Sequence, residues 1–291
     1  MVSLNEITSQ EIRDFGYTGS ILRIPNGRNL SQFHACQFAD LLTAEKILTF
    51  VGFVSKRKNQ EFLIEAMKFL PANYRLMLIG EPLVAAYQEE LAKKTADLHV
   101  NVTFCGQLGQ QEIAAALEKT HVFVSASKME VQSLVIIEAL ASGTPVVGLS
   151  NETVDELVDA SDGIRLSKDA SPREFAAAVH MICELGEAEY RKLCENSRSR
   201  VNTLDWSIVM EKTLQCYTEI SVQKAKAPAS TISTEVLQKT IAQLPAGRLQ
   251  GILLEALSNV SMPSGEKTSS EQYLRQNELI LNQFRGFIFF L

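Results

Sequence analysis

Short apolar runs alternate with amphipathic segments from residue 46 to residue 185. The apolar runs have the length and composition of buried strands, and the segments between them repeat apolar residues at helical spacing. The predicted strands are 46–54, 74–82, 100–106, 121–127 and 144–149, and the predicted helices are 59–70, 86–98, 110–120, 133–142, 153–160 and 171–185. This alternation predicts an α/β fold with a doubly wound, Rossmann-like parallel sheet, whose ligand site lies at the carboxyl ends of the strands.

Local signals place several helix starts. Ser171-Pro172-x-Glu174 is a capping box with proline at the first helical position. Thr8-x-x-Glu11 has the same form and predicts a short helix from Thr8 to Asp14, and Asn59 is a candidate N-cap for the helix at 59–70. Residues 21–29 (ILRIPNGRN) predict a short strand that ends in a Pro-Asn-Gly turn.

The pattern changes near residue 222. Residues 223–234 are polar and predict a linker, and helical patterns follow at about 234–244, 247–258 and 269–284. The chain therefore divides into an α/β domain at 31–222, a linker at 223–234 and a small helical extension at 235–291, which ends in the apolar tail FRGFIFFL.

Composition indicates which class of partner the protein binds and in which cellular compartment it resides. A net charge of −6 argues against nucleic acid as the main partner, because phosphate neutralisation needs a basic surface. Five cysteines without CxxC spacing indicate reduced thiols in a cytoplasmic protein, and four scattered histidines give no zinc pattern. The apolar runs are shorter than the roughly 18 residues of a transmembrane helix, which leaves peripheral membrane contact open.

The stretch SASKMEVQSLVIIEALASGTPVV at 125–147 places two acids, Glu130 and Glu138, in a small and apolar context. A helix that begins near Ser133 would offer the free N–H groups of Ser133, Leu134 and Val135 to an anion at the sheet edge. Glu138 suits a ribose diol because a carboxylate only accepts hydrogen bonds, and Glu130 would face a group beyond the phosphate. Alternatively, Glu130 is a solvated loop acid and Glu138 a surface position.

Residues 130–147 resemble the E-x7-E signature of the retaining glycosyltransferases of family 4, the group 1 transferases, which have two domains in the GT-B architecture. Further landmarks of that family follow one another in the expected order over roughly residues 18 to 220. They are Ile24-Pro25-Asn26-Gly27 with Phe33, the glycine-to-lysine loop VGFVSKRKN with Lys58, LIGEP at 78–82, VTFCG at 102–106 and the tryptophan-containing LDWSIVMEKTLQCYTEI at 204–220.

The resemblance implies a role for each candidate site residue. It places the donor sugar against Glu130, the catalytic candidate, and the nucleotide ribose against Glu138. It assigns the distal phosphate to the amides of Ser133, Leu134 and Val135. It assigns the diphosphate to Lys58, with Arg57 or Lys56 as additional cations. The implied donor is a nucleotide sugar, UDP-linked by preference, held without a metal or other cofactor.

Three features depart from the family pattern. Phe53 stands where the family has an arginine, and Val131-Gln132-Ser133 replaces a Gly-aromatic-Gly turn. The family also has an N-terminal α/β domain that holds the acceptor, and residues 1–30 resemble the end of that domain. We therefore expect the chain to act as a donor half, with an acceptor domain or a partner chain completing the enzyme.

The leading hypothesis is a retaining glycosyltransferase that moves a hexose-type sugar from a nucleoside diphosphate to an acceptor. The main alternative is a non-catalytic nucleotide-sugar-binding or scaffold subunit, which the three departures favour. The sequence argues against a nicotinamide-dependent oxidoreductase, because no G-x-G-x-x-G follows any predicted strand. It also argues against a serine or cysteine hydrolase, because it contains no G-x-S-x-G.

Overall fold

The computed structural model describes residues 1–34 and 45–226, without side chains at 220–226. The predicted helical extension at 235–291, its tail and most of the predicted linker lie outside the described residues. One compact unit spans Met1–Val222, and its last helix, α10, covers Trp206–Lys226.

A six-stranded parallel sheet forms the centre of this unit. Its strand order, β5-β4-β3-β6-β7-β8, is that of a doubly wound fold, so the predicted fold class is confirmed. The strands are β3 (Lys46–Val51), β4 (Tyr74–Ile79), β5 (Val102–Gly106), β6 (Val122–Ser125), β7 (Val146–Leu149) and β8 (Gly163–Leu166). The last of these was not among the predicted strands.

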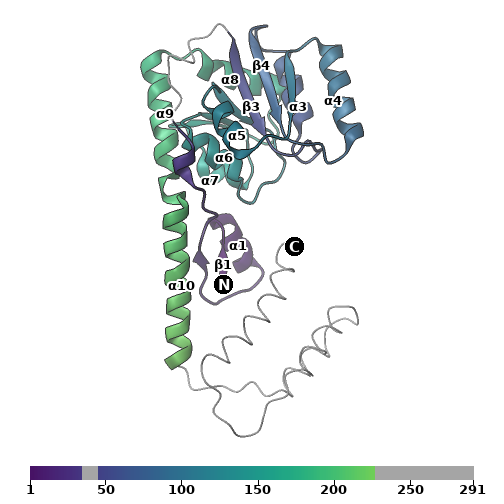
Figure 1. The fold of residues 1–291 in the computed structure, drawn as a ribbon. Helices are drawn as coiled ribbons and strands as arrows, with labels where there is room; N and C mark the ends of the chain where they lie inside the picture. Colours follow the sequence, from purple (N-terminus) through teal and green to yellow (C-terminus); the bar gives the residue numbers. More distant parts are fainter. Residues whose placement is uncertain (35–44, 227–291) are drawn as a thin grey trace, which may run out of the picture. The chain divides into compact units, whose positions relative to one another are not determined.

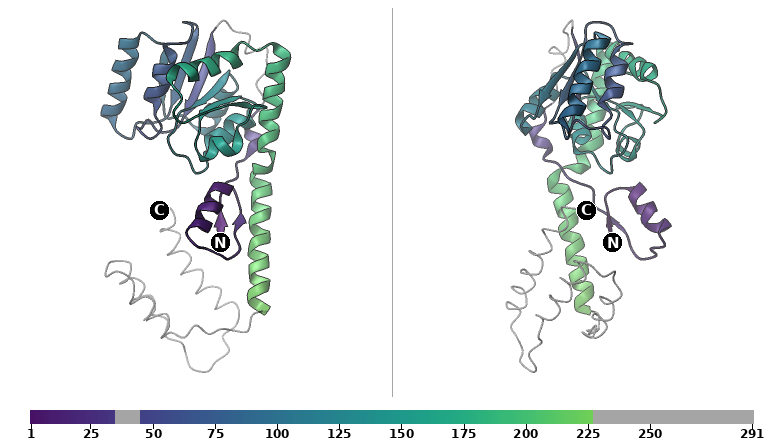
Figure 2. Two further views of the ribbon diagram at one scale, coloured as in Figure 1. Left: turned by 180° about the vertical axis from the view of Figure 1, so that it is seen from behind. Right: turned by 90° about the vertical axis from the view of Figure 1, so that its right-hand side faces the viewer.

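Helices flank the sheet on both sides (Figures 1 and 2). They are α3 (Gln60–Met67), α4 (Ala85–Leu98), α5 (Gln110–Leu117), α6 (Leu134–Ala141), α7 (Glu152–Leu157), α8 (Pro172–Cys183) and α9 (Glu187–Val201). The predicted capping box at Ser171 is confirmed, because the hydroxyl of Ser171 accepts from the N–H of Glu174 and the Glu174 side chain accepts from the N–H of Ser171. Asn59 occupies the N-cap position of α3 in a left-handed conformation, but its side chain caps no N–H.

Each face of the sheet has its own apolar core. Leu48 and Phe50 of β3 pack on one side with α3 and α8, where Phe62 and Phe175 meet edge to face at 5.4 Å between ring centroids. Val51 contributes to the other core, with α5 and α6. Because successive side chains of a strand point to opposite faces, a short apolar strand supplies both cores at once.

The strand order reverses between β3 and β6. From β3 the chain runs outward through β4 and β5, and it then returns to place β6 on the other side of β3. The loops that leave the carboxyl ends of β3 and β6 therefore lead to helices on opposite faces of the sheet, α3 and α6. The predicted site residues at 57–58 and 130–138 lie in these two loops and in α6.

A small parallel pair, β1 (Val2–Ser3) and β2 (Leu22–Arg23), precedes this sheet. The helix between them, α1, spans Glu6–Asp14, and its N-cap is Asn5, whose side chain accepts from the N–H of Thr8. The predicted start at Thr8 is therefore wrong by two residues. Asn5 takes the cap because it lies before the first turn, where its oxygen can reach a free amide.

The Pro-Asn-Gly turn packs directly on the start of α10. A Cβ atom at Gly27 would lie 3.1 Å from Cα of Trp206 and 3.0 Å from Cβ of Val209. The backbone of Arg28 donates to the carbonyl of Leu204 at 2.9 Å and accepts from the N–H of Trp206 at 2.8 Å. Two motifs that stand far apart in the sequence therefore form one packed joint.

The loops after β3 and β4 approach each other through two glycines. Gly52 and Gly80 have φ angles of +149° and +140°, and a Cβ atom on Gly80 would lie 2.1 Å from the carbonyl oxygen of Gly52. Lys58 follows in the first of these loops, and its Cε would be 3.6 Å from a Cβ atom on Gly52. Because glycine has no side chain, the two loops can pack against each other beside the candidate site.

We predict that Gly80→Ala lowers the free energy of unfolding by more than about 3 kcal/mol, because strain at positive φ adds to a clash with backbone. Gly106→Ala is the matched control, since Gly106 also has positive φ (+67°) but no atom within 4 Å of the added Cβ. It should cost only about 1 kcal/mol. Urea unfolding of both variants measures the difference, and equal losses would show that the contact with Gly52 is unimportant.

Candidate functional site

A buried ion pair between Lys58 and Glu130 lies at the point where the strand order reverses. Lys58 comes from the loop after β3, and Glu130 comes from the turn after β6. The two side chains are only 11% and 10% exposed. The structure therefore brings together the candidate diphosphate cation and the candidate catalytic acid, and Glu130 is not a solvated loop residue.

Hydrogen bonds hold these two loops against each other. The carbonyl of Arg57 accepts from the N–H of Lys128 at 2.9 Å, and the Arg57 guanidinium donates to the carbonyl of Met129 at 3.0 Å. The Arg57 side chain thus braces the turn that carries Glu130. Arg57 is exposed, so part of its charge faces solvent.

The turn at 130–133 is also tied to α7. The N–H of Glu130 donates to the Glu152 carboxylate at 3.1 Å, and the hydroxyl of Thr153 donates to the carbonyl of Glu130 at 3.3 Å. The N–H of Ser133 donates to Oγ1 of Thr153 at 2.9 Å. The expected free amide at Ser133 is therefore a wrong prediction, because the first turn of α7 supplies its acceptor.

Leu134 and Val135 are the first two residues of α6, and both are half-buried. Their N–H groups precede the first intrahelical hydrogen bonds, as at any helix start. The side chain of the N-cap residue, Ser133, caps no N–H. Of the three amides predicted to meet an anion at the tip of α6, these two lie ahead of the first intrahelical bond and are not engaged by Thr153.

Glu138 is almost fully buried, at 2% exposure, and forms an ion pair with Arg28. Burial raises the pKa of Glu138 above its usual value, and the Arg28 guanidinium offsets only part of that shift. The ion pair joins the second turn of α6 to the Pro-Asn-Gly loop. Glu138 is therefore not a surface position.

Arg28, Glu152 and Thr153 also belong to this site, although the sequence did not predict them there. Arg28 directly follows the motif Ile24-Pro25-Asn26-Gly27. The sequence therefore indicated its place next to the motif, but it did not indicate that Glu138 is its partner. Glu152 and Thr153 open a helix that the pattern predicted, without any sign that its first turn meets residues 130–133.

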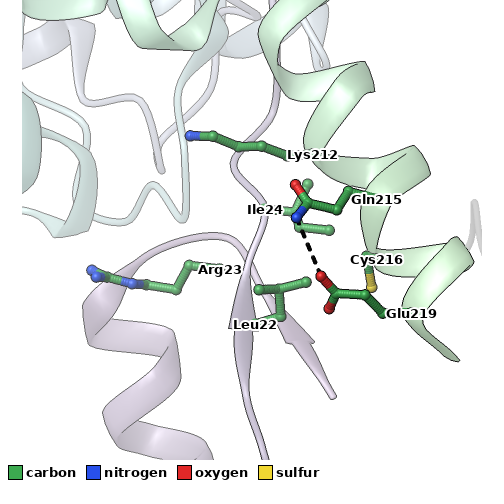
Figure 3. Close-up of a pocket in the computed structure, with 7 residues that line it drawn as sticks. All are labelled: Leu22, Arg23, Ile24, Lys212, Gln215, Cys216 and Glu219. Atoms are coloured by element: carbon green, nitrogen blue, oxygen red, sulfur yellow. Dashed lines mark hydrogen bonds between the residues drawn. The ribbon is translucent and has the colours of Figure 1, made fainter. Parts of the chain in front are cut away.

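A separate groove lies between β2 and α10 (Figure 3), with a cavity volume of about 130 Å³. On the wall that α10 forms, Gln215 donates to Glu219 at 3.2 Å. Arg23 extends away from α10 and pairs with Glu6 at 2.6 Å. Ligand pockets for molecules of nucleotide size span about 300–1,000 Å³. The groove is too small for a nucleotide sugar, and none of the predicted site residues lines it.

Within residues 1–34 and 45–226, no cluster of three metal-ligating side chains occurs, and no helix has the length and apolar character needed to cross a bilayer. In the part of the chain that the structure describes, Cys105, Cys183, Cys194 and Cys216 form no disulfide.

We predict that Lys58→Met lowers the free energy of unfolding by about 3 kcal/mol, because it leaves the buried Glu130 carboxylate without its cation. The double variant Lys58→Met/Glu130→Gln should recover most of that loss. Arg23→Met is the control, since the exposed Arg23–Glu6 pair should contribute less than about 1 kcal/mol. Chemical unfolding at pH 7 separates these cases, and a double variant no more stable than Lys58→Met would contradict the pairing.

Comparison with known families gives a match at the residues that form this site. The family described as Glycosyl transferases group 1 matches residues 45–184, which include Lys58, Glu130 and Glu138. This segment covers β3 to α8.

Curated relatives agree with this match. The chain is 25% identical over 215 residues to the phosphatidyl-myo-inositol mannosyltransferase of Mycolicibacterium smegmatis, covering 72% of this chain and 54% of that protein. It is 23% identical over 232 residues to the GDP-mannose-dependent alpha-mannosyltransferase of Corynebacterium glutamicum, covering 77% and 53%. The chain thus spans about half the length of these relatives.

Solved structures share the fold. The sucrose-phosphate synthase from Thermosynechococcus elongatus superposes with a TM-score of 0.68 and 26% identity, over 76% of this chain and 58% of that one. Anabaena HepE, solved with UDP and glucose, superposes with a TM-score of 0.66 and 19% identity, over 76% and 62%, which is evidence for the fold alone. The family match at 45–184, the relatives and the shared fold together make the α/β unit similar to the group 1 glycosyl transferases.

Proposed function

We propose that this chain carries the nucleotide-sugar donor domain of a retaining, family-4-like glycosyltransferase. The observation that carries the proposal is the Lys58–Glu130 pair at the reversal of the strand order, with Glu138 in the adjoining helix. Lys58 and Glu130 pair at the sheet edge where α/β proteins bind ligands, and Glu138 lies in α6, the helix that follows Glu130. A cation suits a diphosphate, and the two carboxylates suit the polyhydroxylated groups on either side of it.

In the proposed reaction the bond between the sugar anomeric carbon and the diphosphate oxygen breaks. An acceptor hydroxyl oxygen bonds to that carbon on the same face, and its proton passes to the departing diphosphate. The departing nucleoside diphosphate keeps the electron pair and gains negative charge. Lys58, Arg57 and the N–H groups of Leu134 and Val135 would stabilise that charge in the transition state. Glu130 would face the sugar and Glu138 the ribose.

We propose UDP as the preferred nucleotide, with GDP as the competitor to be tested. HepE and the S. aureus protein TarM, which share this fold, are solved with UDP. One of the relatives is GDP-mannose-dependent. Binding without a metal, and a cytoplasmic location inferred from the free thiols, remain predictions.

We further propose that a second α/β domain, in the same chain or in a partner chain, holds the acceptor. The β1–β2 pair supports this, because parallel sheets are normally covered on both faces and extended by further strands. Val2 and Leu22 of this pair are 51% and 42% exposed, and Phe15 after α1 is 94% exposed. Residues 1–30 would then belong to that second domain and residues 31–222 to the donor domain.

A non-catalytic nucleotide-sugar-binding subunit is the second candidate. Two observations favour it: both candidate carboxylates already have basic partners, and the amide of Ser133 is engaged by Thr153. Phe53 and the turn without glycines point the same way. Sugar transfer that Glu130→Gln abolishes, measured with the acceptor domain present, would exclude this candidate.

We predict that UDP or GDP binds the chain with a Kd well below 1 mM in isothermal titration calorimetry, with or without EDTA. Glu138→Gln should weaken the tighter nucleotide about 10-fold to 100-fold, because a hydrogen bond to a charged group contributes about 1.5–3 kcal/mol. Glu89→Ala, an exposed acid of α4, is the control and should leave binding unchanged. Millimolar or weaker binding of both nucleotides to the wild type would contradict the proposed function.

A further inference from the structure

The Pro-Asn-Gly loop makes two contacts with the segment that carries the candidate carboxylates. The N–H of Asn26 donates to Oε1 of Gln132 at 2.5 Å, and Arg28 forms its ion pair with Glu138. Residues 26–28 therefore lie against both the turn before α6 and the second turn of α6. This loop forms one wall of the region that the proposed function assigns to the nucleotide.

The backbone of Arg28 is fixed on both sides. Its N–H donates to Leu204 and its carbonyl accepts from Trp206, so that Arg28 and Asp205 form an isolated parallel bridge. The N–H of Leu30 donates to the Asp205 carboxylate at 3.2 Å. A side chain that starts from so constrained a backbone presents its guanidinium in a reproducible position.

The ion pair leaves one donor of Arg28 without a partner. Nη2 of Arg28 meets Oε1 of Glu138, whereas Nε of Arg28 is buried without a hydrogen-bond partner. The Nε2 atom of Gln132 is likewise buried without a partner. An arginine and a carboxylate that served stability alone would gain from two parallel hydrogen bonds. Here Nε of Arg28 stays unsatisfied, at a cost in stability.

We propose that Arg28 is a specificity-determining residue of the donor site, which holds the Glu138 carboxylate in position for the ribose hydroxyls of a nucleoside diphosphate. The inference rests on the proposed function. It assigns Arg28 a positioning role, because the residue acts on the ribose through Glu138. The preference for ribose over deoxyribose should therefore depend on Arg28, although the Arg28 side chain itself binds no part of the nucleobase.

The test compares the affinities of UDP and GDP with those of their 2′-deoxy counterparts, dUDP and dGDP, by calorimetry on the full chain. The wild type should bind the ribonucleotide at least 10-fold more tightly than the deoxynucleotide. Arg28→Met should bring that ratio close to 1, and Arg28→Lys should restore part of it. Thermal unfolding of each variant verifies that it is folded.

Arg198→Met is the matched control, because Arg198 also anchors α6, through a 2.8 Å hydrogen bond to the carbonyl of Ala141 at the opposite end of the helix. It should keep the wild-type ratio. An unchanged ratio in Arg28→Met, or tighter binding than in the wild type because Arg28 blocks the site, would overturn the inference and leave the proposed function standing. Failure of the wild type to bind either ribonucleotide would overturn both.

Discussion

The ion pair between Lys58 and Glu130 joins two loops that the chain topology sends to opposite faces of the sheet. A lysine and a carboxylate that are both nearly buried are stable only as a pair, because each alone would carry a large desolvation cost. The neighbouring features depend on the same proximity. Arg57 braces the turn that carries Glu130, and the close approach of Gly52 and Gly80 keeps the lysine loop against the sheet edge.

Both candidate carboxylates are buried and paired with a cation. Each candidate carboxylate has a basic partner, so a bound diphosphate would have to share or displace existing pairs. Lys58 can serve an incoming phosphate only by weakening its contact with Glu130, which would free that acid to face the sugar. Arg28 differs, because its proposed role needs its contact with Glu138 to persist when a nucleotide binds. The two ion pairs therefore suit different parts of a nucleotide sugar.

Most of the fold follows from local pattern. Alternating apolar strands and amphipathic helices predicted five of the six strands of the main sheet, and the Ser171 capping box predicted the start of α8 to the residue. Weak local signals failed. Thr8 and Asn5 compete for the same cap, and only the geometry of the preceding chain selects Asn5. The short β8 carries too few apolar residues to stand out from a loop.

For the candidate site, the sequence by itself determined which residue types occur and in what order: two acids eight positions apart, a lysine loop and a helix start. Only the tertiary structure decided their partners. Glu138 meets Arg28, Ser133 meets Thr153 and Glu130 meets Lys58 across separations of 20 to 110 residues. Such pairings depend on how parallel strands are ordered in the sheet, and strand order is a property of packing that leaves no local pattern.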